Sequence, residues 1–113
     1  FSMTQHDPTV RMHHMLDHAK EAVELLAGRG KADLKGNRVL ELALVRLVEI
    51  VGEAAARMTV EEQSRYPSIP WKEIVGMRNR LVHGYDVIDL DVLWDTVQID
   101  LPQLIAELER ILC

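Results

Sequence analysis

The stretch 39–58 limits what this chain can fold into more than any other part of the sequence. Its apolar residues recur three and four positions apart, which is the spacing of an α-helix. They occupy more than one stripe, so the helix is apolar over a wide arc and must be central or face two partners. The apolar positions are Val39, Leu40, Ala43, Leu44, Leu47, Val48, Ile50, Val51, Ala54, Ala55 and Met58.

Helical patterns cover most of the remaining chain, while alternating β patterns and hairpin turn signals are lacking. Asp7-Pro8 and Thr59 have the residue types that begin helices. Pro102 falls inside the last apolar stripe and predicts an interruption near 99–101. We therefore predict an all-α bundle of four main helices plus a short helix. The expected helices cover 8–26, 39–58, 70–84 and 89–112, with a short helical turn over 60–65 and a polar connection over 29–37.

The length and the cysteine content suit a single intracellular domain. We interpret Phe1-Ser2 as a cloning remnant ahead of a start methionine, Met3, and 4–113 as one domain of this 113-residue chain. No apolar run approaches the ~18 residues of a membrane span, and no leader pattern is present. The single cysteine, Cys113, cannot form an internal disulfide. We expect a cytoplasmic protein that does not enter a membrane.

Charge is spread unevenly along the chain. The formal net charge is −5, which argues against a protein that coats nucleic acid. Lys and Arg number nine against ten acids in 1–69, three against one in 70–85, and one against seven in 86–113. The positive segment 70–85 can hold a phosphate site but not a broad basic face. Alternatively, these charges only solvate a surface.

The positive segment contains a dense group of polar side chains, namely Arg78, Asn79, Arg80, His83 and Tyr85. A guanidinium binds phosphate with two hydrogen bonds and an imidazole exchanges protons near neutral pH, so the set suits phosphodiester chemistry. On a continuous helix Asn79 and His83 share a face, whereas Arg78 and His83 lie about 140° apart. One helix alone therefore does not bring Arg78 to His83. Alternatively, both arginines pair with the acids that follow and His83 caps a helix end.

Metal and cofactor sites are not indicated by the remaining residues. His14 and His18 are four apart and could share a metal, but no acidic or cysteine partner stands at a matching spacing. A glycine-rich phosphate loop and a serine nucleophile elbow are both lacking. We expect neither a metal nor a cofactor.

Several blocks of the sequence follow one another in a recognisable order. They are 50–55, Ile69-Pro70-Trp71, Gly76 through Tyr85, and Asp100-Leu101-Pro102. The third block contains Arg78-Asn79, three further residues, His83, one more residue and Tyr85. Together the blocks, which span nearly all of 8–112, resemble the HepT-like branch of the HEPN superfamily.

The resemblance implies a homodimeric HEPN-like bundle in which two Arg–His motifs face one cleft and cleave RNA without a metal. Arg78 would hold the scissile phosphate, His83 would exchange protons with the ribose 2′-hydroxyl, and Asn79 would orient His83 or the phosphate. HepT-like members are toxins of type VII toxin–antitoxin pairs. Their antitoxin, a minimal nucleotidyltransferase called MntA, transfers AMP from ATP to the motif tyrosine, which is Tyr85 in this chain.

Two further residues, Arg80 and Glu53, are expected to support the site, with Glu53 pairing with Arg78 or Arg80. The acidic segment beside the motif indicates a narrow RNA contact, such as an end or a loop of a transfer or messenger RNA. A rival interpretation is a non-catalytic module whose cleft binds a nucleotide or a partner protein. A third interpretation, the antitoxin of the pair, finds no nucleotidyltransferase motif in the chain.

Overall fold

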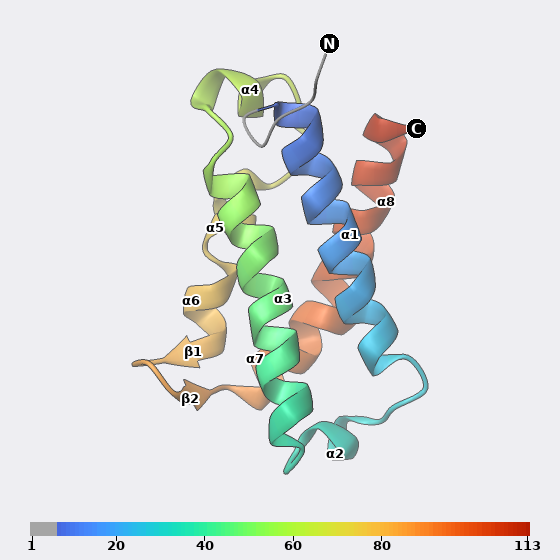
Figure 1. The fold of residues 1–113 in the computed structure, drawn as a ribbon, viewed down its shortest axis with the longest axis vertical. Coiled ribbons are helices and arrows are strands. Elements are labelled where there is room, and N and C mark those ends of the chain that lie inside the picture. Colours follow the sequence, from blue (N-terminus) through green and yellow to red (C-terminus); the bar gives the residue numbers. More distant parts are fainter. Residues whose placement is uncertain (1–6) are drawn as a thin grey trace.

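The structure is a computed structural model that describes residues 7–113, so the interpretation of Phe1, Ser2 and Met3 lies outside the described residues. Long helices form the body of the molecule and short elements connect them (Figure 1). The elements are α1 (Pro8–Leu26), α2 (Lys31–Leu34), α3 (Arg38–Ala56), α4 (Val60–Ser64), α5 (Trp71–Val75), α6 (Met77–Leu81), β1 (Val82–His83), β2 (Val87–Ile88), α7 (Leu90–Asp95), the π-helical turn η1 (Thr96–Asp100) and α8 (Leu101–Leu112).

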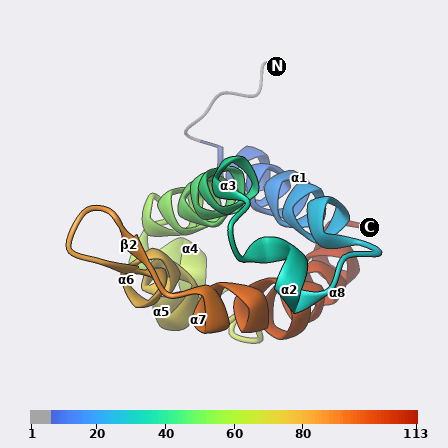
Figure 2. The ribbon, with the colours of Figure 1, turned by 90° about the horizontal axis from the view of Figure 1, so that it is seen from below.

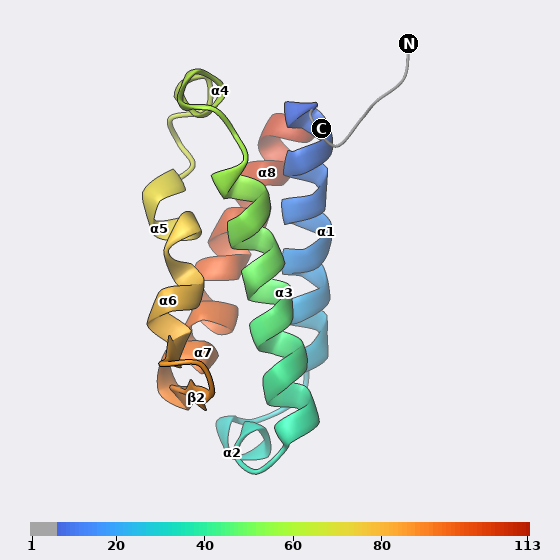
Figure 3. The same cartoon turned by 60° about the vertical axis from the view of Figure 1, so that its left-hand side comes forward.

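Helix α3 is the centre of the fold. It packs against α1 on one side and against α5 and α6 on the other, and α8 packs against α1 (Figure 3). Seen along the bundle, α1 and α3 lie opposite the row formed by α5 to α8 (Figure 2). Buried aliphatic side chains of α3 fill the space between these layers, among them Leu44, Val48, Val51 and Ala55. The predicted all-α fold and the central position of 39–58 are confirmed.

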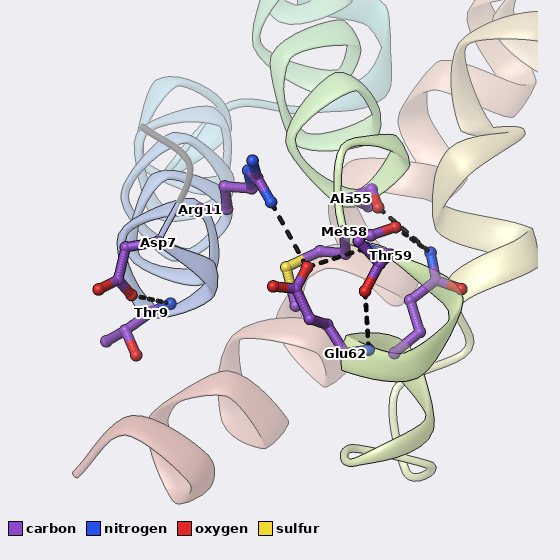
Figure 4. A network of polar contacts seen from close by, with 8 residues as sticks. Asp7, Thr9, Arg11, Ala55, Met58, Thr59 and Glu62 are labelled. Atoms are coloured by element: carbon purple, nitrogen blue, oxygen red, sulfur yellow. Dashed lines mark hydrogen bonds and ion pairs between the residues drawn. The ribbon is translucent and has the colours of Figure 1, made fainter. Parts of the chain in front are cut away.

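Helix α4 follows the end of α3 and contacts the start of α1, as Figure 4 shows. Thr59 caps α4 by accepting a hydrogen bond from the backbone N–H of Glu62 at 3.0 Å, and Glu62 accepts one from the N–H of Thr59 at 2.9 Å. The Glu62 carboxylate also forms a 3.5 Å ion pair with the largely buried Arg11 of α1. The predicted helical turn after Thr59 is thus confirmed, and it is tied to α1. Asp7 likewise caps α1, as predicted, by accepting from the N–H of Thr9 at 2.8 Å.

Gly52 allows α3 and α5 to approach closely. A Cβ atom at this position would lie 3.2 Å from the carbonyl oxygen of Ile74 and 3.6 Å from that of Val75. Backbone oxygens cannot move aside as a flexible side chain can, so a larger residue would separate the two helices. This contact sets how near α5 and the following α6 lie to the outer part of α3.

The expected helix over 70–84 is wrong in its last three residues. It pauses at Gly76, ends at Leu81, and gives way to the antiparallel hairpin of β1 and β2, in which His83 pairs with Val87. Gly84, at φ +67°, supplies the left-handed conformation that a three-residue turn needs. The strands were missed because each has only two residues and their turn lacks an Asn-Gly or Asp-Gly pair.

Two further local expectations have different outcomes. The interruption predicted from Pro102 is confirmed, because the chain passes through η1 and restarts as α8 with Pro102 in its first turn. The connection 29–37, expected to be only a polar loop, contains the one-turn helix α2. Its single buried side chain, Leu34, explains why this segment folds onto the bundle.

Candidate functional site at the end of α6

The polar side chains predicted to form the site lie on three successive elements. Arg78, Asn79 and Arg80 belong to α6, His83 belongs to β1, and Tyr85 lies in the hairpin turn. This part of the chain stands at one edge of the molecule, beside the outer side of α3 (Figures 1 and 3). The site is therefore carried by short exposed elements and supported by a long buried one.

Arg78 is held by an acid of α3. Its Nε atom lies 3.5 Å from Oε2 of Glu49, and its side chain is 36% exposed. The Glu49 carboxylate also contacts Arg46 at 2.6 Å, and Arg46 in turn lies 3.7 Å from Glu53. The expectation that Glu53 pairs with Arg78 or Arg80 is wrong, because Glu49, one helical turn earlier on α3, takes that place. The contact with Glu49 is made through Nε, and a guanidinium has further N–H donors that can bind an anion.

His83 faces an acid that follows the hairpin. Its Nε2 atom lies 3.6 Å from Oδ2 of Asp89, and its side chain is 65% exposed. The backbone N–H of Val92, and secondarily His83, hold the pKa of Asp89 below its usual range. The alternative in which His83 caps a helix end is wrong, since Val82 occupies the cap position of α6 and His83 lies in a strand.

Asn79 and Arg80 do not align with His83 as a continuous helix would require. Asn79 is exposed on α6, but the helix ends at Leu81, so the predicted i,i+4 pairing with His83 does not form. Arg80 donates from Nη2 to the carbonyl oxygen of Glu73 at 3.3 Å. The alternative in which both arginines pair with the acids of 86–113 is also wrong, because Arg78 pairs with an acid of α3 and Arg80 with a backbone carbonyl.

Tyr85 is the most exposed of the large hydrophobic side chains in the described residues, at 90%. It follows Gly84 at the tip of the hairpin, where no other described element covers it. A phenol in this position is open to a second protein from several directions.

A groove of about 600 Å³ lies on the other side of α6. Ile74, Met77 and Leu104 supply apolar lining, and polar side chains surround them. Arg80 lines this groove, whereas Arg78 and His83 do not, so α6 separates its two arginines. The polar lining residues are Ser68, Glu73, Arg80, Asp100, Gln103 and Glu107.

Sequence reasoning missed the two acids that contact the site, Glu49 and Asp89. Glu49 had a weak signal, since it lies one turn before Glu53 on the same helix. Asp89 was identified only as the start of a helix, which it is, because it accepts a hydrogen bond from the N–H of Val92 at 3.1 Å. Sequence spacing predicts neither contact, because each acid comes close to its partner side chain only when the chain folds back.

The remaining expectations about metals and membranes concern the whole described chain. Over 7–113 no group of three or more His, Cys, Asp and Glu side chains is arranged to hold a metal ion. The rings of His14 and His18 lie edge to face with centroids 6.3 Å apart. In the same range no helix combines the length and the apolarity of a membrane span.

Comparison with known proteins gives a consistent set of relatives. A family described as "Ribonuclease HepT-like" matches residues 15–111. A Methanocaldococcus jannaschii protein named "Putative RNase MJ1380" is 32% identical over 107 residues, which cover 95% of this chain and 98% of that protein. A Thermococcus cleftensis protein named "Probable ribonuclease HepT" is 33% identical over 100 residues, covering 85% and 91%. No solved structure is significantly similar to the chain.

Proposed function

The chain belongs to the HepT-like ribonuclease family of the HEPN superfamily, and we propose that it is an endoribonuclease that uses Arg78 and His83. The observation that carries the proposal is the exposure of both side chains on one short stretch beside α3, each backed by a carboxylate from elsewhere in the fold. A cation that binds phosphate and an imidazole that exchanges protons are what RNA cleavage requires.

In the proposed reaction the ribose 2′-hydroxyl attacks the adjacent phosphorus. His83 takes the hydroxyl proton as the bond from the 2′ oxygen to phosphorus forms. The bond from phosphorus to the 5′ oxygen breaks, the departing oxygen takes a proton from water, and His83 returns its proton to the hydroxide that is left. The products are a 2′,3′-cyclic phosphate and a 5′-hydroxyl. Arg78 offsets the negative charge that develops on the phosphoryl oxygens, with its Nη groups directed at the phosphate. Asn79 orients the phosphate from the exposed side of α6.

A homodimer would complete the cleft. The outward side of α3 carries apolar side chains that the described chain leaves uncovered, with Val39 80% exposed and Leu42 exposed as well. Exposed apolar residues on a helix that also holds Glu49 favour an interface next to the site. Two copies joined there would bring two Arg78–His83 pairs to one narrow cleft, which suits an end or a loop of a transfer or messenger RNA.

Regulation by AMP transfer fits the position of Tyr85. In the proposed step the phenol oxygen bonds to the α-phosphorus of ATP, pyrophosphate leaves, and the phenol proton passes to solvent. The catalyst would be a partner nucleotidyltransferase of the MntA type, which makes this chain the toxin of a type VII pair. The added phosphate would place an anion near Arg78 and fill the cleft, and both effects oppose RNA entry.

RNA cleavage by the purified chain in the presence of EDTA tests the enzyme proposal and its independence of metal. We expect cyclic phosphate ends, and a loss of about a hundredfold or more in His83→Ala and in Arg78→Ala, with unchanged helical circular dichroism. Lys72→Ala, which removes an exposed cation from the neighbouring α5, should cleave like the parent. If both motif variants also cleave like the parent, the non-catalytic binding module is the better interpretation.

Mass spectrometry of the chain incubated with its partner enzyme and ATP tests the modification. We expect AMP on Tyr85 and none in Tyr85→Phe, which should stay active as a nuclease and toxic in cells. Tyr66→Phe, at the only other tyrosine of the chain, is the control and should be modified normally. AMP transfer that silences Tyr85→Phe would contradict the assignment of this residue.

A further inference from the structure

Asp89 is fixed at three points around His83. Its backbone N–H donates to the carbonyl oxygen of Leu81 at 2.7 Å, which ties the end of the hairpin to the end of α6. Its Oδ1 atom accepts the hydrogen bond from the N–H of Val92 that caps α7. Its Oδ2 atom faces Nε2 of His83 at 3.6 Å. Asp89 thus joins three elements, through its backbone N–H and one carboxylate oxygen, and it presents its second carboxylate oxygen to the imidazole.

We propose that Asp89 is the positioning residue that orients His83 for RNA cleavage, an inference that rests on the proposed function. With Nε2 turned to the carboxylate, the proton of the neutral ring resides on Nε2 and Nδ1 is the nitrogen left to accept the proton of the 2′-hydroxyl. When His83 becomes an imidazolium during the reaction, the positive charge faces Asp89 at ion-pair distance. Asp89 itself neither touches the substrate nor exchanges a proton with it.

The two oxygens of Asp89 have separate roles, which makes the inference testable. Oδ1 supports the helix and Oδ2 faces the imidazole, so an amide at this position can keep the cap while it removes the charge. Other charged groups surround the pair. Lys31 on α2 forms an ion pair with Asp91 and is also attracted by Asp89. The hairpin carries Asp86 and Tyr85, and α6 carries Arg78 and Arg80. None of these side chains forms a hydrogen bond or ion pair with His83.

The experiment compares Asp89→Asn with Asp86→Asn, which removes the same charge from the exposed turn of the same hairpin. We expect Asp89→Asn to keep the parent's helical circular dichroism and KM for a short RNA, and to lose about tenfold or more in kcat. Asp86→Asn should retain the parent's kcat.

A second measurement does not depend on nuclease activity. The ring nitrogen signals of His83, followed by NMR as the pH is varied, should indicate a proton on Nε2 in the neutral parent. This preference for Nε2 should be lost in Asp89→Asn. Identical ring signals and identical kcat values in the two proteins would overturn the positioning role. Full activity of His83→Ala would instead overturn the proposed function, so the two failures are distinguishable.

Discussion

The three long helices α1, α3 and α8 differ from the segment 76–89 in how their residues are held. The three long helices bury large side chains completely, including Met15, Leu44 and Leu108. The segment 76–89 consists of five-residue and two-residue elements, and it carries the exposed side chains of His83 and Tyr85. Packing therefore stabilises the long helices throughout, whereas in 76–89 it acts mainly through Met77, Leu81 and Val82, and hydrogen bonds and ion pairs shape the exposed part. The residues proposed to act on RNA lie in the second region, where substrate can reach them.

The strongest way to test this contrast is to truncate one apolar side chain in each region. Leu44→Ala should destabilise the protein by about 2–5 kcal/mol, because a fully buried side chain leaves a cavity. Val87→Ala, at an exposed position in β2, should change the free energy of unfolding by no more than about 0.5 kcal/mol. Urea denaturation measures both values, and similar losses would show that the hairpin is packed as tightly as the core.

The position of the segment 76–89 beside α3 depends on α5, which precedes it, and can be tested at Gly52. Gly52→Val should cost about 1–3 kcal/mol of stability, because its side chain would press on the Ile74 carbonyl oxygen and push α5 away from α3. Nuclease activity should fall as well, since α6 and Arg78 would move away from Glu49. Ala56→Val, at an exposed position of the same helix, is the control. A Gly52→Val variant with the parent's stability would mean that α5 and α6 are not positioned by this contact.

A smaller effect is expected where a cap begins a long helix. Asn37 accepts a hydrogen bond from the N–H of Leu40 at 3.1 Å at the start of α3. Asn37→Ala should cost about 1 kcal/mol, measured by thermal unfolding. Asn37→Asp should restore most of that loss, because an aspartate caps equally well. Nuclease activity should not change in either variant, since the packing of α3 against α1, α5 and α6 keeps its later turns in place.

The smallest effect concerns one acid from each region. Arg110, and secondarily Ser68, lower the pKa of Glu107 on α8, and the N–H of Val92 and then His83 lower that of Asp89. A carboxyl with a lowered folded-state pKa contributes stability above its unfolded pKa of about 4, and this is lost as the pH falls through the folded value. Asp89→Asn and Glu107→Gln should each flatten the decline of urea midpoints below about pH 4. Unchanged slopes in both variants would contradict these contacts.

Much of the fold could be predicted because the signals are local. The first helix and the short helix α4 begin where Asp7 and Thr59 indicate, and Pro102 marks the interruption before α8. The candidate site was predicted only as a set of residue types. Its helix was predicted to extend too far, so that Asn79 and His83 were expected to share a helix face and the hairpin was not predicted. Glu53 was expected to lie beside Arg78, but Glu49 lies there. The two acids are one turn apart on the same side of α3, and the sequence does not distinguish them.

The sequence by itself determined the helices, the apolar core and the residue types of the motif, because periodicity, caps and proline act within a few positions of the chain. The tertiary structure decided which groups face one another. The carbonyl oxygen of Leu81 could have accepted the N–H of Tyr85 and continued the helix, but it accepts that of Asp89 instead. This choice of hydrogen-bond donor ends α6, places His83 in a strand and brings Asp89 close to His83. A choice between a near and a distant hydrogen-bond donor depends on the packing around both, so no local pattern reveals it.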